Sequence, residues 1–83
     1  MTTMVEIGYF LDSPAWTPAE KLVIKWQFHL YGDFYTALWE VIKRADEENL
    51  ERLACGFPLQ IIGFKQWAFG DLGQRLRAAG LEI

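Results

Sequence analysis

The chain has 83 residues, which is enough for one domain and no more. Of these residues 52% are hydrophobic and 16% are aromatic, and 11 acidic side chains against 8 basic ones give a net charge of −3. This balance argues against a nucleic-acid or membrane-surface binder, because such proteins normally carry a basic stripe. We predict a single domain over residues 1–83, with an extended arm at 1–16 and a helical core at 17–80.

Neither a membrane span nor a disulfide framework is predicted. The longest uncharged run, 53–64, contains Gly56 and Pro58 and is shorter than the roughly 18 residues that a span needs. The N-terminus lacks the basic start of a signal peptide. Cys55 is the only cysteine, so no internal disulfide can form, and its apolar neighbours predict a buried thiol. We therefore expect a cytoplasmic protein.

The first patterned segment is 4–11. Val5, Ile7, Tyr9 and Leu11 recur there at a period of two, which predicts an extended segment or a short strand. No second strand signal follows. This arm would therefore have to lie along the helices, pair with a symmetry mate or dock on a partner, because a lone strand leaves its backbone unpaired.

Two helices are predicted next. The run from Thr17 to Glu20 combines an N-cap, a proline at the first helical position and a capping box, so a helix should cover 18–31. Gly32 ends that helix, and a second should cover 34–45, which makes the pair an αα-hairpin. Five apolar residues at helical spacing form the predicted core face of the second helix: Phe34, Leu38, Val41, Ile42 and Ala45.

Shorter helices complete the chain. Asp46 can cap a helix over 47–55, although one continuous helix through Asp46 is an alternative. A strongly apolar helix over 58–69 follows Gly56, and a last short helix begins at Asp71. The predicted fold class is therefore mainly α, a compact bundle of four to five short helices with an extended N-terminal arm.

The sequence predicts no catalytic or metal-binding constellation. Ser13 and His29 are the only serine and histidine, so a catalytic pair would need distant residues to meet by chance. The acidic residues of 46–51 suit the first turn of a helix, where they interact favourably with the macrodipole. Helix-turn-helix DNA binding is disfavoured, because the helix over 58–69 carries a single charge. We predict a protein that is not an enzyme, with no cofactor and no metal.

Aromatic residues carry the predicted binding function. A domain this small can bury only some of its rings, and apolar surface that remains exposed usually marks an interface. The candidate contacts with a protein partner, or within a homo-oligomer, are Tyr9, Phe10, Trp16, Tyr35 and Trp39. Possible anion contacts are a polar line on the first core helix and two arginines near the C-terminus: Lys21, Lys25, His29, Arg75 and Arg77.

The sequence resembles a group of small phage-encoded proteins. Their shared pattern is Trp-Gln, Gly-Asp-Phe, Ala-Leu, Ala-Asp and Gly-Phe-Pro. This chain carries it as Trp26-Gln27, Gly32-Asp33-Phe34, Ala37-Leu38, Ala45-Asp46 and Gly56-Phe57-Pro58. The likeness covers residues 17–80 and implies a phage or prophage origin.

Small phage accessory proteins often bind and disable host machinery, including CRISPR complexes. The resemblance therefore implies an anti-CRISPR-like inhibitor that binds a host defence complex through protein–protein contacts. One alternative is an oligomeric sponge for a nucleotide second messenger, because aromatic faces and cations can hold nucleotides. Another is a small phage regulatory or assembly factor.

Overall fold

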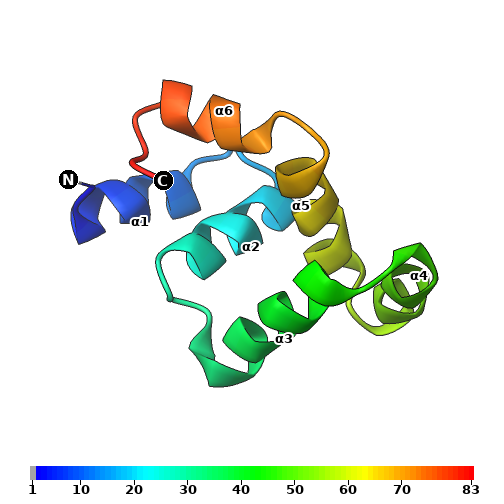
Figure 1. Ribbon diagram of the computed structural model, residues 1–83. Helices are drawn as coiled ribbons and strands as arrows, with labels where there is room; N and C mark the ends of the chain where they lie inside the picture. The colour runs from blue at the N-terminus through cyan, green and yellow to red at the C-terminus, as the bar shows by residue number, and fades with distance from the viewer. Residues whose placement is uncertain (1) are drawn as a thin grey trace.

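The computed structural model describes residues 2–83, and over this range the chain folds into six helices and no strands (Figure 1). The prediction of a mainly α fold is confirmed, with six helices in place of four to five. Near the two ends of the described range, the Glu82 amide donates to the Thr2 hydroxyl over 2.8 Å. The helices are α1 (Met4–Asp12), α2 (Pro18–Gln27), α3 (Gly32–Arg44), α4 (Glu47–Gly56), α5 (Pro58–Ala68) and α6 (Leu72–Ala78).

The prediction of an extended N-terminal arm is wrong, because residues 4–11 lie within the helix α1. The Glu6 amide donates a hydrogen bond of 3.2 Å to the Thr3 hydroxyl at the start of this helix. The Thr-x-x-Glu spacing is typical of a helix N-terminus, and here it outweighs the alternation of apolar residues. Ile7 is buried, and Phe10 packs against the same core three positions later, at helical spacing.

Helix α2 begins where the sequence predicts. The Thr17 amide donates to Glu20 Oε1 over 2.8 Å, and the Glu20 amide donates to the Thr17 hydroxyl over 3.2 Å, which completes the predicted capping box. The helix ends at Gln27, earlier than predicted, because His29 has a left-handed backbone with a φ of 56°.

His29 occupies the position that glycine most often fills at such a helix end. The Leu30 amide donates to the Lys25 carbonyl over 2.8 Å, and the His29 amide donates to the Trp26 carbonyl over 3.2 Å. A left-handed φ is strained for a residue with a Cβ atom. We therefore expect His29→Gly to raise the free energy of unfolding by about 0.5 to 1 kcal/mol in urea titrations. His29→Ala is the control: it keeps the strain, and an equal gain from both variants would contradict this explanation.

Asp46 separates α3 from α4, so the alternative of one continuous helix is excluded. Ala45 is extended, with a ψ of 139°, and the Asn49 amide donates to Asp46 Oδ1 over 2.9 Å at the start of α4. Helix α4 packs against α5, and Lys65 Nζ lies 3.0 Å from Glu47 Oε1 between the two helices.

The core lies where α2 packs across α5. Gly63 makes this close approach possible, because a Cβ atom built there would lie 2.5 Å from the Ala19 carbonyl oxygen and 3.0 Å from Val23 Cγ2. Helices α2, α3 and α6 supply the side chains at the centre that have no solvent exposure: Val23, Ile24, Ile42, Leu72 and Leu76.

Helix α3 turns a different face to the core from the one predicted. Leu38 and Ile42 are buried as expected, but Phe34 is 57% exposed and Val41 is 52% exposed. The half-buried Trp39, on the flank of the predicted face, packs against the core instead. The core face of α3 is therefore rotated, and part of its apolar stripe remains on the surface.

Candidate protein-binding surfaces

Exposed large apolar side chains gather on three helices. On α1 they are Met4, Val5 and Tyr9, and on α3 they are Phe34 and Val41. On α5 and at its C-terminus they are Leu59, Ile62 and Phe69. Contiguous exposed apolar surface on a small protein commonly marks an interaction site, so each helix presents a candidate surface.

The outer side of α1 continues into an apolar hollow, and the two together are called the α1 surface here. The hollow has a volume of about 370 Å³ and is lined by Tyr9, Phe10, Ser13, Ala15, Trp16 and Ala79. Tyr9 is 71% exposed at its rim, whereas the half-buried rings of Phe10 and Trp16 have centroids 5.9 Å apart. The fold thus brings together three of the five predicted partner contacts.

Neighbouring residues hold the Trp16 ring in place. The Arg75 guanidinium carbon lies 5.9 Å from the Trp16 ring centroid, within range of a cation–π interaction. The turn before Trp16 is closed by a hydrogen bond of 3.2 Å from the Ala15 amide to the Ser13 hydroxyl. An indole that is ordered before binding loses little conformational entropy when a partner covers it.

The other two predicted contacts, Tyr35 and Trp39, lie in a separate aromatic cluster. The Trp39 ring centroid is 4.6 Å from that of Trp26 and 5.6 Å from that of Phe64. Tyr35 stacks on Tyr31 with centroids 4.1 Å apart. Both residues are half-buried and pack against the core, so they contribute to the interior of the fold.

The two arginines predicted to contact an anion already have partners within the chain. Arg75 lies 2.7 Å from Glu20 Oε2 and 3.0 Å from Asp71 Oδ1. Arg77 Nε donates to the Ile83 carbonyl over 2.9 Å, and its guanidinium lies over the Trp67 ring. An anion would have to compete with these contacts.

The three other predicted anion contacts follow α2. Lys21 and Lys25 are half-buried, and Lys25 Nζ lies 5.7 Å from the Tyr31 ring centroid. His29 is exposed but lies beyond the end of α2, in the left-handed turn. The polar line expected on one helix face is therefore broken at its last member.

Glu20 is a charged residue that is buried in the core, where it is 3% exposed. Burial raises the pKa of its carboxyl group, but hydrogen bonds from the Thr17 amide and the Arg75 guanidinium outweigh burial and hold the pKa below its ordinary value. The carboxylate thus remains charged and joins the N-terminus of α2 to α6.

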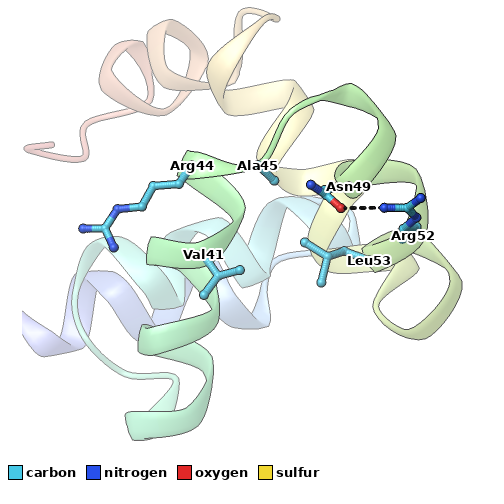
Figure 2. A pocket seen from close by; sticks show the side chains of 6 residues that line it. All are labelled: Val41, Arg44, Ala45, Asn49, Arg52 and Leu53. Atoms are coloured by element: carbon cyan, nitrogen blue, oxygen red, sulfur yellow. Dashed lines mark hydrogen bonds between the residues drawn. The ribbon is translucent and has the colours of Figure 1, made fainter.

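Two further hollows follow the exposed side of α3. They could not be predicted from the sequence, because helical spacing places Phe34 and Val41 on the same predicted core face. The first has a volume of about 370 Å³ and is lined by Phe34, Ala37, Leu38 and Val41. The second lies between α3 and α4, has a volume of about 470 Å³, and is lined by Val41, Arg44, Ala45, Asn49, Arg52 and Leu53. Figure 2 shows Val41 and Leu53 facing one another across the second hollow.

Within residues 2–83, no group of three or more His, Cys, Asp or Glu side chains is placed to hold a metal ion. None of the helices in this part of the chain combines the length and the apolar character that crossing a membrane requires. Cys55 is exposed, so the prediction of a buried thiol is wrong; its Sγ lies 3.6 Å from the Glu51 carbonyl oxygen on the outside of α4.

Comparisons of the chain with protein-family models, with curated proteins and with solved structures find no match.

Proposed function

We propose that this chain is a non-enzymatic binding protein that docks on a partner protein through the α1 surface. The observation that carries the proposal is Tyr9, whose ring is largely exposed beside an apolar hollow that contains Trp16. Tyrosine and tryptophan are enriched among the residues that dominate binding energy at interfaces. The hollow can accept an apolar side chain of the partner, and Tyr9 can cover it.

The neighbours of Tyr9 give the surface the composition of an interface. Met4 and Val5 are exposed one turn before Tyr9 and extend the apolar area along α1. The exposed carboxylates Glu6 and Asp12 lie on the same helix, which has no basic residue in its last turn. An apolar centre with a charged rim is typical of protein–protein interfaces, and an acidic rim favours a partner with basic residues around its contact site.

The resemblance to small phage-encoded proteins suggests the identity of the partner. Such proteins often disable a host complex by occupying one of its surfaces, which requires binding and no catalysis. We therefore propose a host defence complex of the CRISPR type as the partner, in the cytoplasm of the infected cell.

The test replaces exposed side chains and leaves the core intact. In the triple variant Met4→Ser, Val5→Ser, Tyr9→Ser, we expect affinity for the partner to fall at least about tenfold, because three apolar contacts are lost. The assay is the plating efficiency of a restricted phage on a host that carries the defence system and expresses the chain. The wild-type chain should restore plating and co-purify with a defence subunit, whereas the triple variant should do neither.

A matched control is the triple variant Leu59→Ser, Ile62→Ser, Phe69→Ser, which removes as many exposed apolar side chains from the α5 region. This control should restore plating as the wild-type chain does. If the two triple variants behave alike while circular dichroism shows both to be folded, the α1 surface is not the contact site. If the wild-type chain has no effect on any defence system, the anti-defence role is wrong.

A further inference from the structure

The exposed side of α3 consists of two protruding apolar residues and two hollows. Phe34 and Val41 protrude two turns apart on this side, and the small residue Ala37 lies between them. The outward stripe formed by these three residues is called the α3 face here. It is distinct from the α1 surface, and Figure 1 shows α2 lying between α1 and α3.

The spacing of the hollows matches the way in which helices interlock. The first hollow is bounded by Phe34, Ala37, Leu38 and Val41, at i, i+3, i+4 and i+7, which is the four-residue hole that receives a knob from a facing helix. The second hollow repeats this spacing two turns further along α3, where Val41, Arg44 and Ala45 line one side at i, i+3 and i+4. Helix α4 closes its other side with Leu53 and a polar rim (Figure 2).

The two ends of the α3 face carry opposite charges. Asp33 in the first turn and Arg44 in the last turn are both exposed, and within residues 2–83 neither has an ion-pair partner. They are eleven positions apart, about three helical turns or 16 Å, and therefore lie on the same flank of the stripe. Arg44 extends away from Asn49 and Arg52 in Figure 2, so its guanidinium is available to a partner.

We propose that the occupant of the α3 face is a second copy of this chain, with the two α3 helices packed antiparallel about a twofold axis that passes at the level of residue 39. In this register, residue n of one copy faces residue 78 − n of the other copy. The partner's Val41 then faces Ala37 and enters the first hollow, while the partner's Phe34 faces Arg44 and enters the second. Each protruding side chain thus fills a hole of the other copy.

The same register brings the oppositely charged residues at the two ends of the α3 face together. A twofold axis keeps each flank on the same side of the interface and exchanges the two ends, so Asp33 of one copy lies beside Arg44 of the other, twice per dimer. The acid suits the N-terminus and the base suits the C-terminus of an isolated helix, because of the macrodipole. Antiparallel pairing therefore brings opposite charges together at both ends. The α3 face is complementary to itself in shape and in charge, which an unrelated partner would not require.

A charge-exchange experiment tests this arrangement by analytical ultracentrifugation over micromolar to millimolar concentrations. The wild-type chain should approach twice its monomer mass of 9.6 kDa as concentration rises. Asp33→Arg and Arg44→Asp should each raise the dimer dissociation constant by about tenfold, because each creates two like-charge contacts. The double variant exchanges both charges and should return the constant to within about threefold of the wild-type value.

A pair of matched apolar variants provides a second measurement. Val41→Ser should weaken the dimer by about tenfold or more, whereas Ile62→Ser on α5, where the exposure is similar at 49% against 52%, should leave it unchanged. A wild-type chain that stays monomeric throughout would overturn the proposal, and so would a double charge variant no better than the single ones. Neither outcome affects the α1 surface, whose triple variant should dimerise normally.

Discussion

Gly63→Ala is expected to lower the free energy of unfolding by about 3 kcal/mol, the largest effect predicted for a single methyl group in this chain. The added Cβ atom would lie 2.5 Å from the Ala19 carbonyl oxygen, a backbone atom that cannot move without moving α2. Because α2 and α5 form the centre of the fold, separating them also loosens contacts of the buried Val23 and Ile24. Alanine is the better helix former by about 1 kcal/mol, so the measured loss is the net of the two effects.

Urea denaturation would measure this loss, with Gly8→Ala as the matched control. Gly8 also lies inside a helix, but a Cβ atom there would meet nothing within 4 Å. Gly8→Ala should therefore stabilise the chain by up to about 1 kcal/mol through helix propensity alone. If both variants shift the unfolding midpoint in the same direction, the close approach of α2 and α5 at Gly63 is not a determinant of stability.

Local signals in the sequence were sufficient to place most helix starts. Thr17 and Asp46 accept the capping hydrogen bonds that their positions predict, and proline stands at the first position of α2 and of α5. A cap depends on residues within one turn of itself, so it can be recognised without knowledge of the tertiary fold.

Two errors have a common physical origin, which is the presence of two compatible periodicities in one segment. Residues 4–11 alternate at a period of two, but they also place Ile7 and Phe10 on one side of a helix, and only the cap at Thr3 distinguishes the two structures. Similarly, α3 carries more apolar residues than one face can bury. Which part of its stripe meets the core is decided by packing against α2 and α5, and the sequence of α3 alone does not contain that information.

The five candidate binding residues fall into two groups, according to whether a local turn or packing between helices decides their position. Tyr9, Phe10 and Trp16 are close in the chain, so any compact turn at 12–17 brings them together, and the structure does so. The sequence favours Tyr35 and Trp39 as binding contacts just as much, because both are aromatic residues on the flank of a helix. Their burial in the cluster with Trp26 depends on how α3 packs against α2 and α5, through the hydrogen bond from the Trp26 indole to the Tyr35 carbonyl and the contact between the Trp39 and Phe64 rings.

The ion pair between Glu20 and Arg75 links α2 to α6 through a buried carboxylate. Glu20 is buried, and it accepts hydrogen bonds of 2.8 Å from the Thr17 amide and 2.7 Å from the Arg75 guanidinium, which belongs to α6. Asp71 contacts the same guanidinium from the surface, where its side chain is 69% exposed. The two carboxylates therefore form a natural comparison between a buried and an exposed contact with one cation.

Glu20→Gln should lower the free energy of unfolding by about 2 kcal/mol at pH 7, because charge-assisted hydrogen bonds to a buried carboxylate are replaced by weaker neutral ones. Asp71→Asn, the control, should cost less than about 0.5 kcal/mol, because its contact with Arg75 is screened by water.

The pKa of Glu20 is lower in the folded chain than its ordinary value of 4.5. The unfolded chain therefore binds the proton more readily, and the stabilisation is complete above that value and lost as the pH falls through the lower folded pKa. In urea titrations across this range, the difference between wild type and Glu20→Gln should shrink on acidification. A difference that stayed constant down to pH values below the folded pKa would show that the charge of Glu20 does not stabilise the fold.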